Sequence, residues 1–172
     1  MDLLARFAAG DRDAFEELFR RGQADVYRWI VRIVRDRAVA EELTIETFWR
    51  IYRARGRFDP ARGFDGWARR IATNLAIDHL RAGRHEVELP DHLAAAEGAD
   101  PAERRELTRA IRSAFLALPP RLRVAATLAL IEERSYAEIA AALDISVTAV
   151  KSRVFRAVRL LRQRLEREGV RA

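Results

Sequence analysis

The chain has 172 residues, of which 49% are hydrophobic and 34% are charged, and its net charge at pH 7 is +6. This balance is typical of a globular protein and excludes a disordered one. The sequence contains no cysteine, which excludes disulfides, thiolate zinc sites and a thiol redox switch within it.

No continuous apolar run of about 18 residues occurs, so the sequence predicts no transmembrane helix. The N-terminal stretch MDLLARFAAGDRDAF has an acidic residue at position 2 and further charges soon after, a pattern unlike a signal peptide. We therefore expect a cytoplasmic protein.

The charge is unevenly distributed along the chain. Residues 51–84 hold 8 basic and 3 acidic side chains, and residues 104–172 hold 15 and 7. Between these two blocks, residues 85–103 hold 6 acidic side chains and no basic one. Solvated, arginine-rich helix faces are one explanation of the basic blocks. Two nucleic-acid-binding modules joined by an acidic linker are the other.

Apolar residues recur with a period near 3.6 almost throughout, and β-type alternation is absent, so the sequence predicts an all-α protein. Asp13 and Glu16 have the spacing of a capping box, which predicts a helix that opens there and extends to about residue 21. A second helix is predicted over residues 24–35.

A third helix, predicted over residues 38–54, carries two apolar stripes. The first stripe suits the core of a globular protein and consists of Ala40, Leu43, Thr47, Ile51 and Ala54. The second has the same spacing on the opposite side and consists of Ile45, Trp49 and Tyr52. Glu42 and Glu46 border this second stripe. An exposed apolar strip with a charged rim is typical of a partner-binding surface.

The glycines and proline of RGRFDPARGF predict a loop over residues 55–64, and a fourth helix is predicted over residues 65–81. Basic and amide side chains lie on this loop and on one ridge of the helix, namely Arg57, Arg62, Arg70, Asn74 and Arg81. This combination suits single-stranded DNA, because cations follow the phosphates while a splayed base is read at its edge. Phe64 and Trp67 are expected in the core rather than as a platform for bases.

The segment HEVELPDHLAAAEGADP contains two prolines, one glycine and no lysine or arginine, which is typical of a linker between domains. A helix is predicted over residues 102–117. The LPP step at residues 118–120 ends it, because a residue before proline disfavours α geometry. Pro120 then suits the first turn of a further helix that reaches about residue 131.

Residues 135–165, SYAEIAAALDISVTAVKSRVFRAVRLLRQRL, have the layout of a helix-turn-helix. Ser135 and Glu138 have capping-box spacing, and Ser146 can cap the second helix. Asp144 lies at the turn, where aspartate tolerates a left-handed backbone better than most residues do. The inward stripe of the second helix is predicted to be Val147, Val150, Val154, Val158, Leu161 and Leu165.

The outward face of that second helix carries Thr148, Ala149, Ser152, Arg156 and Arg159, and this face is flanked by Lys151, Arg153 and Phe155. These side chains suit the major groove, where arginine donates to guanine, serine bonds in either sense and phenylalanine contacts thymine methyl groups. A helical hairpin with a solvated basic face is the alternative. DNA binding explains the combination of the cap, the turn, the inward stripe and the basic face better than the hairpin does.

Taken together, these stretches resemble the extracytoplasmic-function (ECF, group four) sigma factors, the small class of bacterial RNA polymerase specificity subunits. The resemblance is carried by GDRDAFEELFRR, VYRWIVRIVRDRAVAEELTIETFWRIYRA, RFDPARGFDGWARRIATNLAIDHLR, LPPR and SYAEIAAALDISVTAVKSRVFRA. Their order and spacing extend over nearly the whole chain, which is more specific than a helix-turn-helix alone.

The resemblance implies two helical domains, with region two over residues 1–84, an acidic linker over 85–103 and region four over 104–172. Region two would bind the clamp helices of the β′ subunit through Glu42, Ile45, Glu46 and Trp49. It would open the minus-ten promoter element through Arg57, Arg62, Arg70, Asn74 and Arg81. Region four would contact the β flap and read the minus-thirty-five element through Thr148, Lys151, Ser152, Arg153, Phe155 and Arg156.

Three positions depart from the family pattern. Ile45 stands where glutamine is usual, so apolar packing is expected there in place of a polar contact. Glu42 stands where aspartate is usual and Asp144 where glycine is usual, and both changes are tolerable.

The resemblance implies a binding protein with no cofactor and no catalytic chemistry, and HExxH, P-loop and nucleophile motifs are absent from the sequence. It also implies an anti-sigma protein as a further partner. A stand-alone helix-turn-helix regulator of duplex DNA is the alternative function, although residues 1–84 resemble neither a receiver nor a ligand-binding domain.

Overall fold

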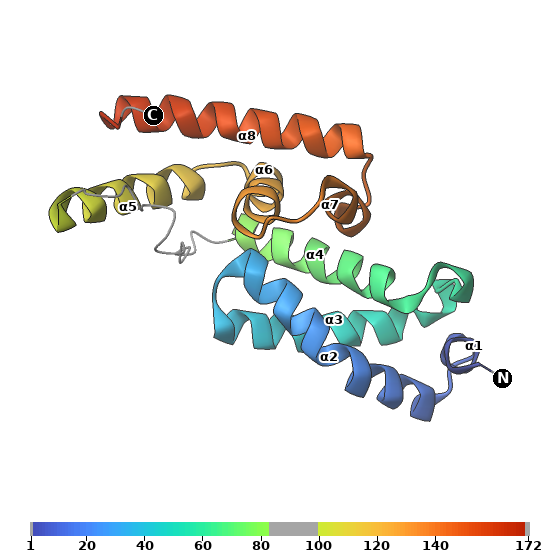
Figure 1. Cartoon of the computed structure of the whole chain (residues 1–172). Coiled ribbons are helices and arrows are strands. Elements are labelled where there is room, and N and C mark those ends of the chain that lie inside the picture. The colour runs from blue at the N-terminus through green and yellow to red at the C-terminus, as the bar shows by residue number, and fades with distance from the viewer. Residues whose placement is uncertain (1, 83–99, 171–172) are drawn as a thin grey trace. The chain divides into compact units, whose positions relative to one another are not determined.

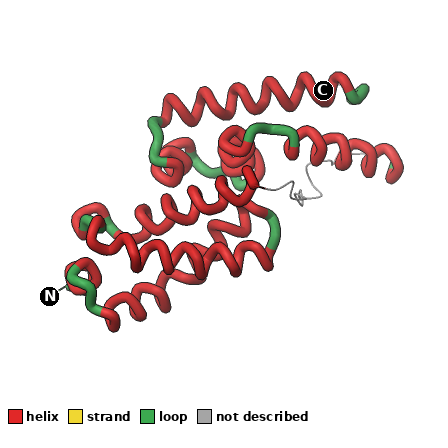
Figure 2. The backbone as a smooth tube through the Cα atoms, turned by 180° about the vertical axis from the view of Figure 1, so that it is seen from behind, coloured by secondary structure: helices red, strands yellow, loops and turns green. Residues whose placement is uncertain are grey.

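The computed structural model describes residues 2–82 and 100–170. Every regular element in these ranges is helical (Figures 1 and 2), which confirms the all-α prediction. The described residues form two compact units, the first built on the chain up to His79 and the second built mainly on the residues after the gap. Most of the predicted linker, residues 85–99, lies outside the described residues.

The first unit consists of helices and two short 3-10 turns. In chain order these are α1 (Leu3–Ala8), α2 (Arg12–Val34), α3 (Arg37–Ala54), η1 (Arg55–Arg57), η2 (Pro60–Arg62) and α4 (Phe64–Ala82). Both α3 and α4 begin one residue before their predicted starts. The side chain of Asp36 caps α3 by accepting a hydrogen bond from the Val39 amide at 3.0 Å.

The start of α2 differs from the prediction. Its N-cap is Asp11, whose Oδ1 accepts a hydrogen bond from the Ala14 amide at 3.0 Å. The predicted capping box of Asp13 and Glu16 is therefore wrong. Asp11 has the extended backbone that a cap requires, whereas Asp13 already lies in the first helical turn.

α2 is also one helix where two were predicted, because it continues through Gly22 to Val34. A Cβ atom at Gly22 would lie 3.4 Å from Cζ of Phe48 and 3.6 Å from Cε1 of Phe64. These two rings therefore pack against the helix at Gly22. Tertiary packing of the rings thus compensates for the poor helix propensity of glycine.

α3 buries its first predicted stripe and leaves most of the second exposed. The residues of the first stripe that are buried are Ala40, Leu43, Thr47 and Ile51. In the second stripe, the side chain of Ile45 is 68% exposed and that of Trp49 is 56% exposed. Tyr52 is half-buried beside Phe15, with 4.9 Å between the ring centroids. The first stripe is therefore buried and most of the second is exposed, as their positions on opposite sides of the helix predicted.

An aromatic cluster joins α1, the loop after η1 and the start of α4. The ring centroid of Phe58 lies 4.9 Å from that of Trp67, 5.5 Å from that of Phe7 and 6.1 Å from that of Phe64. Each pair of this kind adds about 0.5–1.5 kcal/mol to the stabilisation from buried area. Phe64 thus belongs to the core, as expected, whereas Trp67 packs in the same cluster but is only half-buried. α1, which supplies Phe7, was not predicted from the sequence.

The second unit consists of α5 (Pro101–Leu116), α6 (Pro120–Ala126), η4 (Thr127–Ile131), α7 (Tyr136–Leu143) and α8 (Val147–Arg167). Its hydrophobic core contains Ala114, Phe115, Leu118, Ala126, Ala157 and Leu161. The single helix predicted from Pro120 to residue 131 changes into a π-helical turn at Thr127. There the Glu132 amide donates to the Thr127 carbonyl at 3.0 Å, five residues back along the chain.

Gly22→Ala is expected to raise the free energy of unfolding of the first unit by about 0.5–1 kcal/mol, because alanine is the better helix former. Its Cβ would make ordinary contacts with Phe48 and Phe64. Gly22→Leu is expected to destabilise the unit, since a long side chain would displace both rings. Urea unfolding followed by tryptophan fluorescence reports on this unit, and destabilisation by Gly22→Ala would contradict the packing described.

Candidate nucleic-acid and partner interfaces

The exposed stripe of α3 lies on a stable helix and has a charged edge. Ile45 and Trp49 are one helical turn apart, so their side chains lie on the same face. Glu42 is exposed, and Glu46 accepts a hydrogen bond from Nε of Arg50 at 2.8 Å. The structure therefore brings the four predicted partner-binding residues of α3 together on one helix surface.

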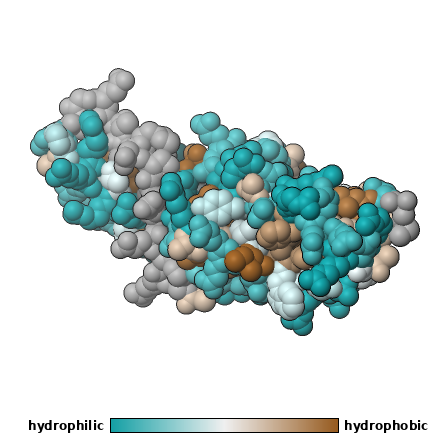
Figure 3. Space-filling model, turned by 90° about the horizontal axis from the view of Figure 1, so that it is seen from below, coloured by the Kyte–Doolittle hydropathy of each residue, from teal (hydrophilic) through white to brown (hydrophobic). Residues whose placement is uncertain are grey.

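An apolar groove of about 570 Å³ lies beside this stripe, between α2 and α3. The residues that line it are Phe15, Glu16, Phe19, Arg20, Gln23, Ile45, Phe48 and Trp49. Phe15 and Phe19 were not predicted as part of the surface, although their spacing of four residues on α2 places them on one face. In the view of Figure 3, apolar side chains form small groups among hydrophilic ones. A groove of this kind can accommodate the apolar face of another helix.

The loop between α3 and α4 has a defined conformation. Phe58 is buried, while its neighbours Arg57 and Asp59 are exposed. Oδ1 of Asp59 accepts a hydrogen bond from the Ala61 amide at 3.0 Å, which stabilises η2. Arg62, at the end of η2, is also exposed. The loop therefore presents Arg57 and Arg62 to solvent from a backbone that the buried Phe58 ring anchors.

The other predicted minus-ten residues lie along α4. Asn74 and Arg81 are exposed and Arg70 is partly exposed. Their spacing of 4 and 11 residues from Arg70 places them on one ridge of the helix. The first unit therefore carries its predicted DNA-binding side chains on one loop and one helix that follow each other in the chain.

The helix-turn-helix begins with the predicted capping box. The Ser135 amide and hydroxyl both donate to Oε2 of Glu138, at 2.9 and 2.8 Å, and the Glu138 amide donates to the Ser135 hydroxyl at 3.2 Å. These bonds from Ser135, with a smaller contribution from Arg134, hold the pKa of Glu138 below its ordinary value. Ser135 and Glu138 thus cap each other's backbone amides at the N-terminus of α7.

The turn between α7 and α8 also follows the prediction. Asp144 has a left-handed backbone with φ of 54°, and the next amide, of Ile145, donates to the Ala140 carbonyl at 3.1 Å. Ser146 then caps α8 by accepting a hydrogen bond from the Ala149 amide at 3.1 Å. The direction in which α8 leaves the turn is therefore determined by local hydrogen bonds.

The outward face of α8 contains the predicted DNA-reading residues. The exposed ones are Thr148, Lys151, Ser152, Phe155 and Arg156, and Arg153 is partly buried. The Phe155 ring is 69% exposed. Val147 was predicted to face inward but is 41% exposed, because it lies in the first turn, before the buried part of the stripe begins at Val150.

The guanidinium groups of Arg121 and Arg156 are close enough to Arg153 to influence its charge. Partial burial and the positive charges of Arg121 and Arg156 lower the pKa of Arg153 from its ordinary value. Arg156 donates to the carbonyl and the hydroxyl of Ser152, both at 3.4 Å. Such a concentration of cations attracts the phosphates of nucleic acid. Arg121, at the start of α6, was not predicted, because only the fold brings it near α8.

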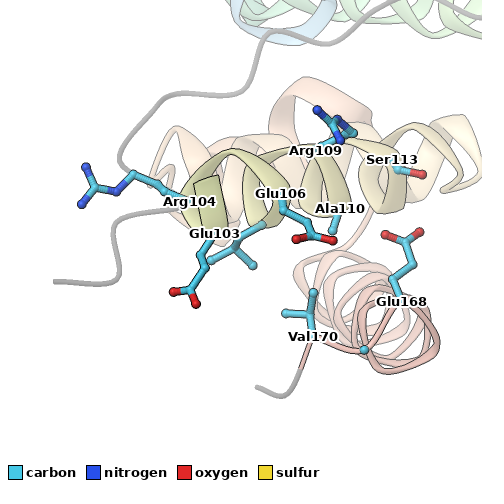
Figure 4. Close-up of a pocket in the computed structure, with 10 residues that line it drawn as sticks. Glu103, Arg104, Glu106, Arg109, Ala110, Ser113, Glu168 and Val170 are labelled. Carbon is cyan, nitrogen blue, oxygen red and sulfur yellow. The ribbon is translucent and has the colours of Figure 1, made fainter. Parts of the chain in front are cut away.

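A separate hollow of about 610 Å³ lies between α5 and the end of α8 (Figure 4). Three carboxylates, of Glu103, Glu106 and Glu168, line it together with the guanidinium groups of Arg104 and Arg109. This mixed charge is unlike the basic surface that nucleic acid requires. None of the predicted DNA-binding residues lines the hollow. Within residues 2–82 and 100–170, no helix is both long and apolar enough to cross a membrane.

Comparison with known proteins places both units in one family. The family models for Sigma-70 region 2 and Sigma-70 region 4 match residues 18–86 and 108–161. The RNA polymerase sigma factor CarQ of Myxococcus xanthus is 37% identical over 169 residues, which cover 94% of this chain and 95% of CarQ. The ECF RNA polymerase sigma factor SigW of Bacillus subtilis is 32% identical over 170 residues and is covered to 91%, as is this chain.

Among solved structures, CnrH in complex with the cytosolic domain of CnrY has a TM-score of 0.58 and 28% identity to this chain, with 95% of each chain covered. A helical unit followed by a basic helix-turn-helix unit, each matching a sigma-70 region, defines a bacterial promoter-recognition protein. The chain belongs to the ECF sigma factors of the sigma-70 family.

As a member of this family, the chain directs core RNA polymerase to specific promoters and helps to open the minus-ten element. Proteins of this family act by binding and carry out no catalytic reaction of their own. The alternative function, a stand-alone helix-turn-helix regulator, does not account for the match of the first unit to Sigma-70 region 2.

Ser135→Ala is expected to raise the pKa of Glu138 toward its ordinary value, because it removes the hydroxyl hydrogen bond that lowers this pKa most. A lowered pKa means that the carboxylate stabilises the folded unit above the ordinary glutamate pKa. That contribution is lost as the pH falls through the lowered value. A carboxyl-carbon NMR titration of Glu138 measures the change, and the same pKa in both proteins would rule out Ser135 as its cause.

Proposed function

We propose that the exposed stripe of Ile45 and Trp49 on α3, with Glu42 and Glu46 at its edge, binds the β′ clamp helices of core polymerase. The observation that carries this proposal is the exposure of two large apolar side chains on a helix whose other stripe is buried. Burial by a partner gains about 1.5–3 kcal/mol for a large apolar side chain. The adjoining aromatic groove extends the apolar surface available to a helical partner. At position 45, apolar packing replaces the polar contact that the usual glutamine would make.

We assign contacts with the single-stranded minus-ten element to the loop and α4, through Arg57, Arg62, Arg70, Asn74 and Arg81. The loop conformation supports this assignment, since burial of Phe58 leaves the two loop arginines exposed. Cations on an ordered loop can follow phosphates without a large entropic cost on binding. The amide of Asn74 adds a group that can read a base edge.

We assign recognition of the minus-thirty-five element to α8, through Thr148, Lys151, Ser152, Arg153, Phe155 and Arg156. The caps and the left-handed turn orient the start of this helix, which is the part that enters the major groove in helix-turn-helix proteins. Arg153 and Arg156 supply positive charge, and Phe155 supplies an exposed apolar contact for thymine methyl groups.

The wider assignment follows the two family matches. Region two comprises residues 1–84, region four comprises residues 104–172, and the acidic residues 85–103 link them. Region four also contacts the β flap of the polymerase. We place the protein in the cytoplasm, where its polymerase and promoters are. We also propose that this chain is held by an anti-sigma protein, as the resemblance implies. CnrH, a structural relative, was solved in complex with a second protein, the cytosolic domain of CnrY.

Trp49→Ala is expected to weaken binding to core polymerase by about 2 kcal/mol or more, the range typical of a buried tryptophan at an interface. The unfolding transition of the isolated protein should change little, because the Trp49 side chain is exposed. Fluorescence-detected titration with core polymerase measures the affinity. Phe155→Ala is the matched control, an exposed aromatic residue of the other unit that should leave core binding unchanged. Unfolding of the isolated Trp49→Ala protein would place Trp49 in the core and contradict the assignment.

Arg156→Ala is expected to reduce discrimination between promoter sequences by about 1–3 kcal/mol if its guanidinium reads a base edge. Holoenzyme affinity for duplexes with single substitutions in the minus-thirty-five element measures this discrimination. Arg162→Ala, six residues further along α8, serves as the control and should leave discrimination unchanged. A loss of equal size on every sequence would instead make Arg156 a phosphate contact.

A further inference from the structure

The short helix α1 precedes the residues that match Sigma-70 region 2, yet it takes part in the core of the first unit. The family match begins at residue 18, whereas α1 covers Leu3–Ala8. Its residue Phe7 has no solvent exposure. A buried phenylalanine on a six-residue helix cannot be explained by that helix alone, because so short a helix is not stable in isolation.

Phe7 is in contact with the anchor of the loop to which we assign minus-ten binding. Its ring centroid lies 5.5 Å from that of Phe58, at an interplanar angle of 61°. It also lies 5.9 Å from the ring of Phe64 and 6.4 Å from that of Trp67. Phe58 therefore has partners from two directions, with Phe7 from α1 and the other two rings from α4. Without the Phe7 ring, a cavity would open on one side of the loop anchor.

The same N-terminal segment also lies beside the start of the loop. Gly10, which follows α1, has φ of 94°, and a Cβ atom placed on it would lie 3.6 Å from Nε of Arg55 in η1. Arg55 is itself held by a hydrogen bond to the Tyr52 carbonyl at 2.8 Å and lies over the Tyr52 ring at 4.4 Å. The turn after α1 thus lies beside a fixed arginine three residues before Phe58, close enough that a side chain at Gly10 would meet it.

The turn itself is also held in place. Nε of Arg6 donates to Oδ2 of Asp11 at 2.7 Å, and the Asp11 amide donates to the Arg6 carbonyl at 3.0 Å. The Gly10 amide donates to the Phe7 carbonyl at 2.9 Å. Because Asp11 is the N-cap of α2, these bonds connect the direction of α1 to the long helix of the unit. The position of Phe7 is therefore determined by α2 on one side and by the aromatic cluster on the other.

We propose that α1 is a positioning element for the minus-ten loop, in which Phe7 holds Phe58 and thereby fixes the direction of Arg57 and Arg62. The inference rests on the proposed role of the loop in binding single-stranded DNA. Arg57 is adjacent to the anchor in sequence and Arg62 follows it by four residues, so a shift of the anchor displaces both guanidinium groups. In this proposal α1 influences DNA binding only through the loop and does not itself bind DNA.

The test compares Phe7→Ala with Ile30→Ala, a change at another fully buried residue of the same unit. Both variants are assembled with core polymerase below their unfolding temperatures. Affinity is measured for a fork-junction promoter with a single-stranded minus-ten element. Phe7→Ala should lower it by about tenfold, within the range of coupling between neighbouring residues, and Ile30→Ala should leave it near the wild-type value. Core affinity should be unchanged in both. Equal losses of fork-junction affinity in the two variants would mean that Phe7 contributes only to stability, and would overturn the proposal.

Arg57→Ala/Arg62→Ala separates this inference from the role of the loop. If the double variant binds the fork junction as wild type does, the loop does not bind the minus-ten strand and the proposed function fails. If it binds weakly, Phe7→Ala added to it should cause no further loss, because Phe7 acts only through these arginines. A further tenfold loss would overturn the positioning role alone. Gly10→Ala, strained at its positive φ, offers an independent route if Phe7→Ala does not fold, and it should show the same dependence on the loop arginines.

Discussion

The central constraint on this structure is that α3 packs against its own unit on one side and leaves apolar side chains exposed on the other. One stripe of this helix is buried against its own unit, and residues such as Thr47 and Ile51 have no solvent exposure. On the opposite stripe, Ile45 and Trp49 are exposed to water. This exposure does not stabilise the isolated unit and is typical of a partner-binding surface. Because the buried stripe holds the helix in place, the exposed stripe is presented as a rigid surface. Binding of a partner then requires little reorganisation of the protein.

The two proposed DNA-binding surfaces are also held in place before binding, each by a different kind of interaction. The loop before α4 is fixed by long-range packing, since the Phe58 ring lies among rings from α1 and α4. The start of α8 is fixed by short-range hydrogen bonds from Ser135, Glu138 and Ser146 and by the left-handed turn between the helices. Side chains supported in this way keep their geometry before the nucleic acid arrives, which favours specificity over adaptability.

The features that were predictable from the sequence are those determined by residues close in the chain. The two stripes of α3, the capping box before α7 and the turn at Asp144 all depend on spacings of a few residues, and the structure confirms them. The end of a helix predicted near residue 21 was wrong because rings from distant helices pack against α2 at Gly22 and compensate for the low helix propensity of glycine. α1 has too few residues to show a period, and the burial of Phe7 depends on partners about 50 residues away. The roles of the individual DNA- and polymerase-contacting residues stay predictions.

Photocrosslinking from α3 tests the central claim most directly, because it identifies what covers the exposed stripe. A benzophenone amino acid placed at Ile45, whose side chain is 68% exposed, would be irradiated in holoenzyme reconstituted with core polymerase. A crosslink to the β′ subunit is the expected result, and the same group placed at Arg162 on α8 should give none to the clamp helices. Assembly of the holoenzyme without any crosslink from position 45 to β′ would contradict the assignment of this stripe as the polymerase-binding surface.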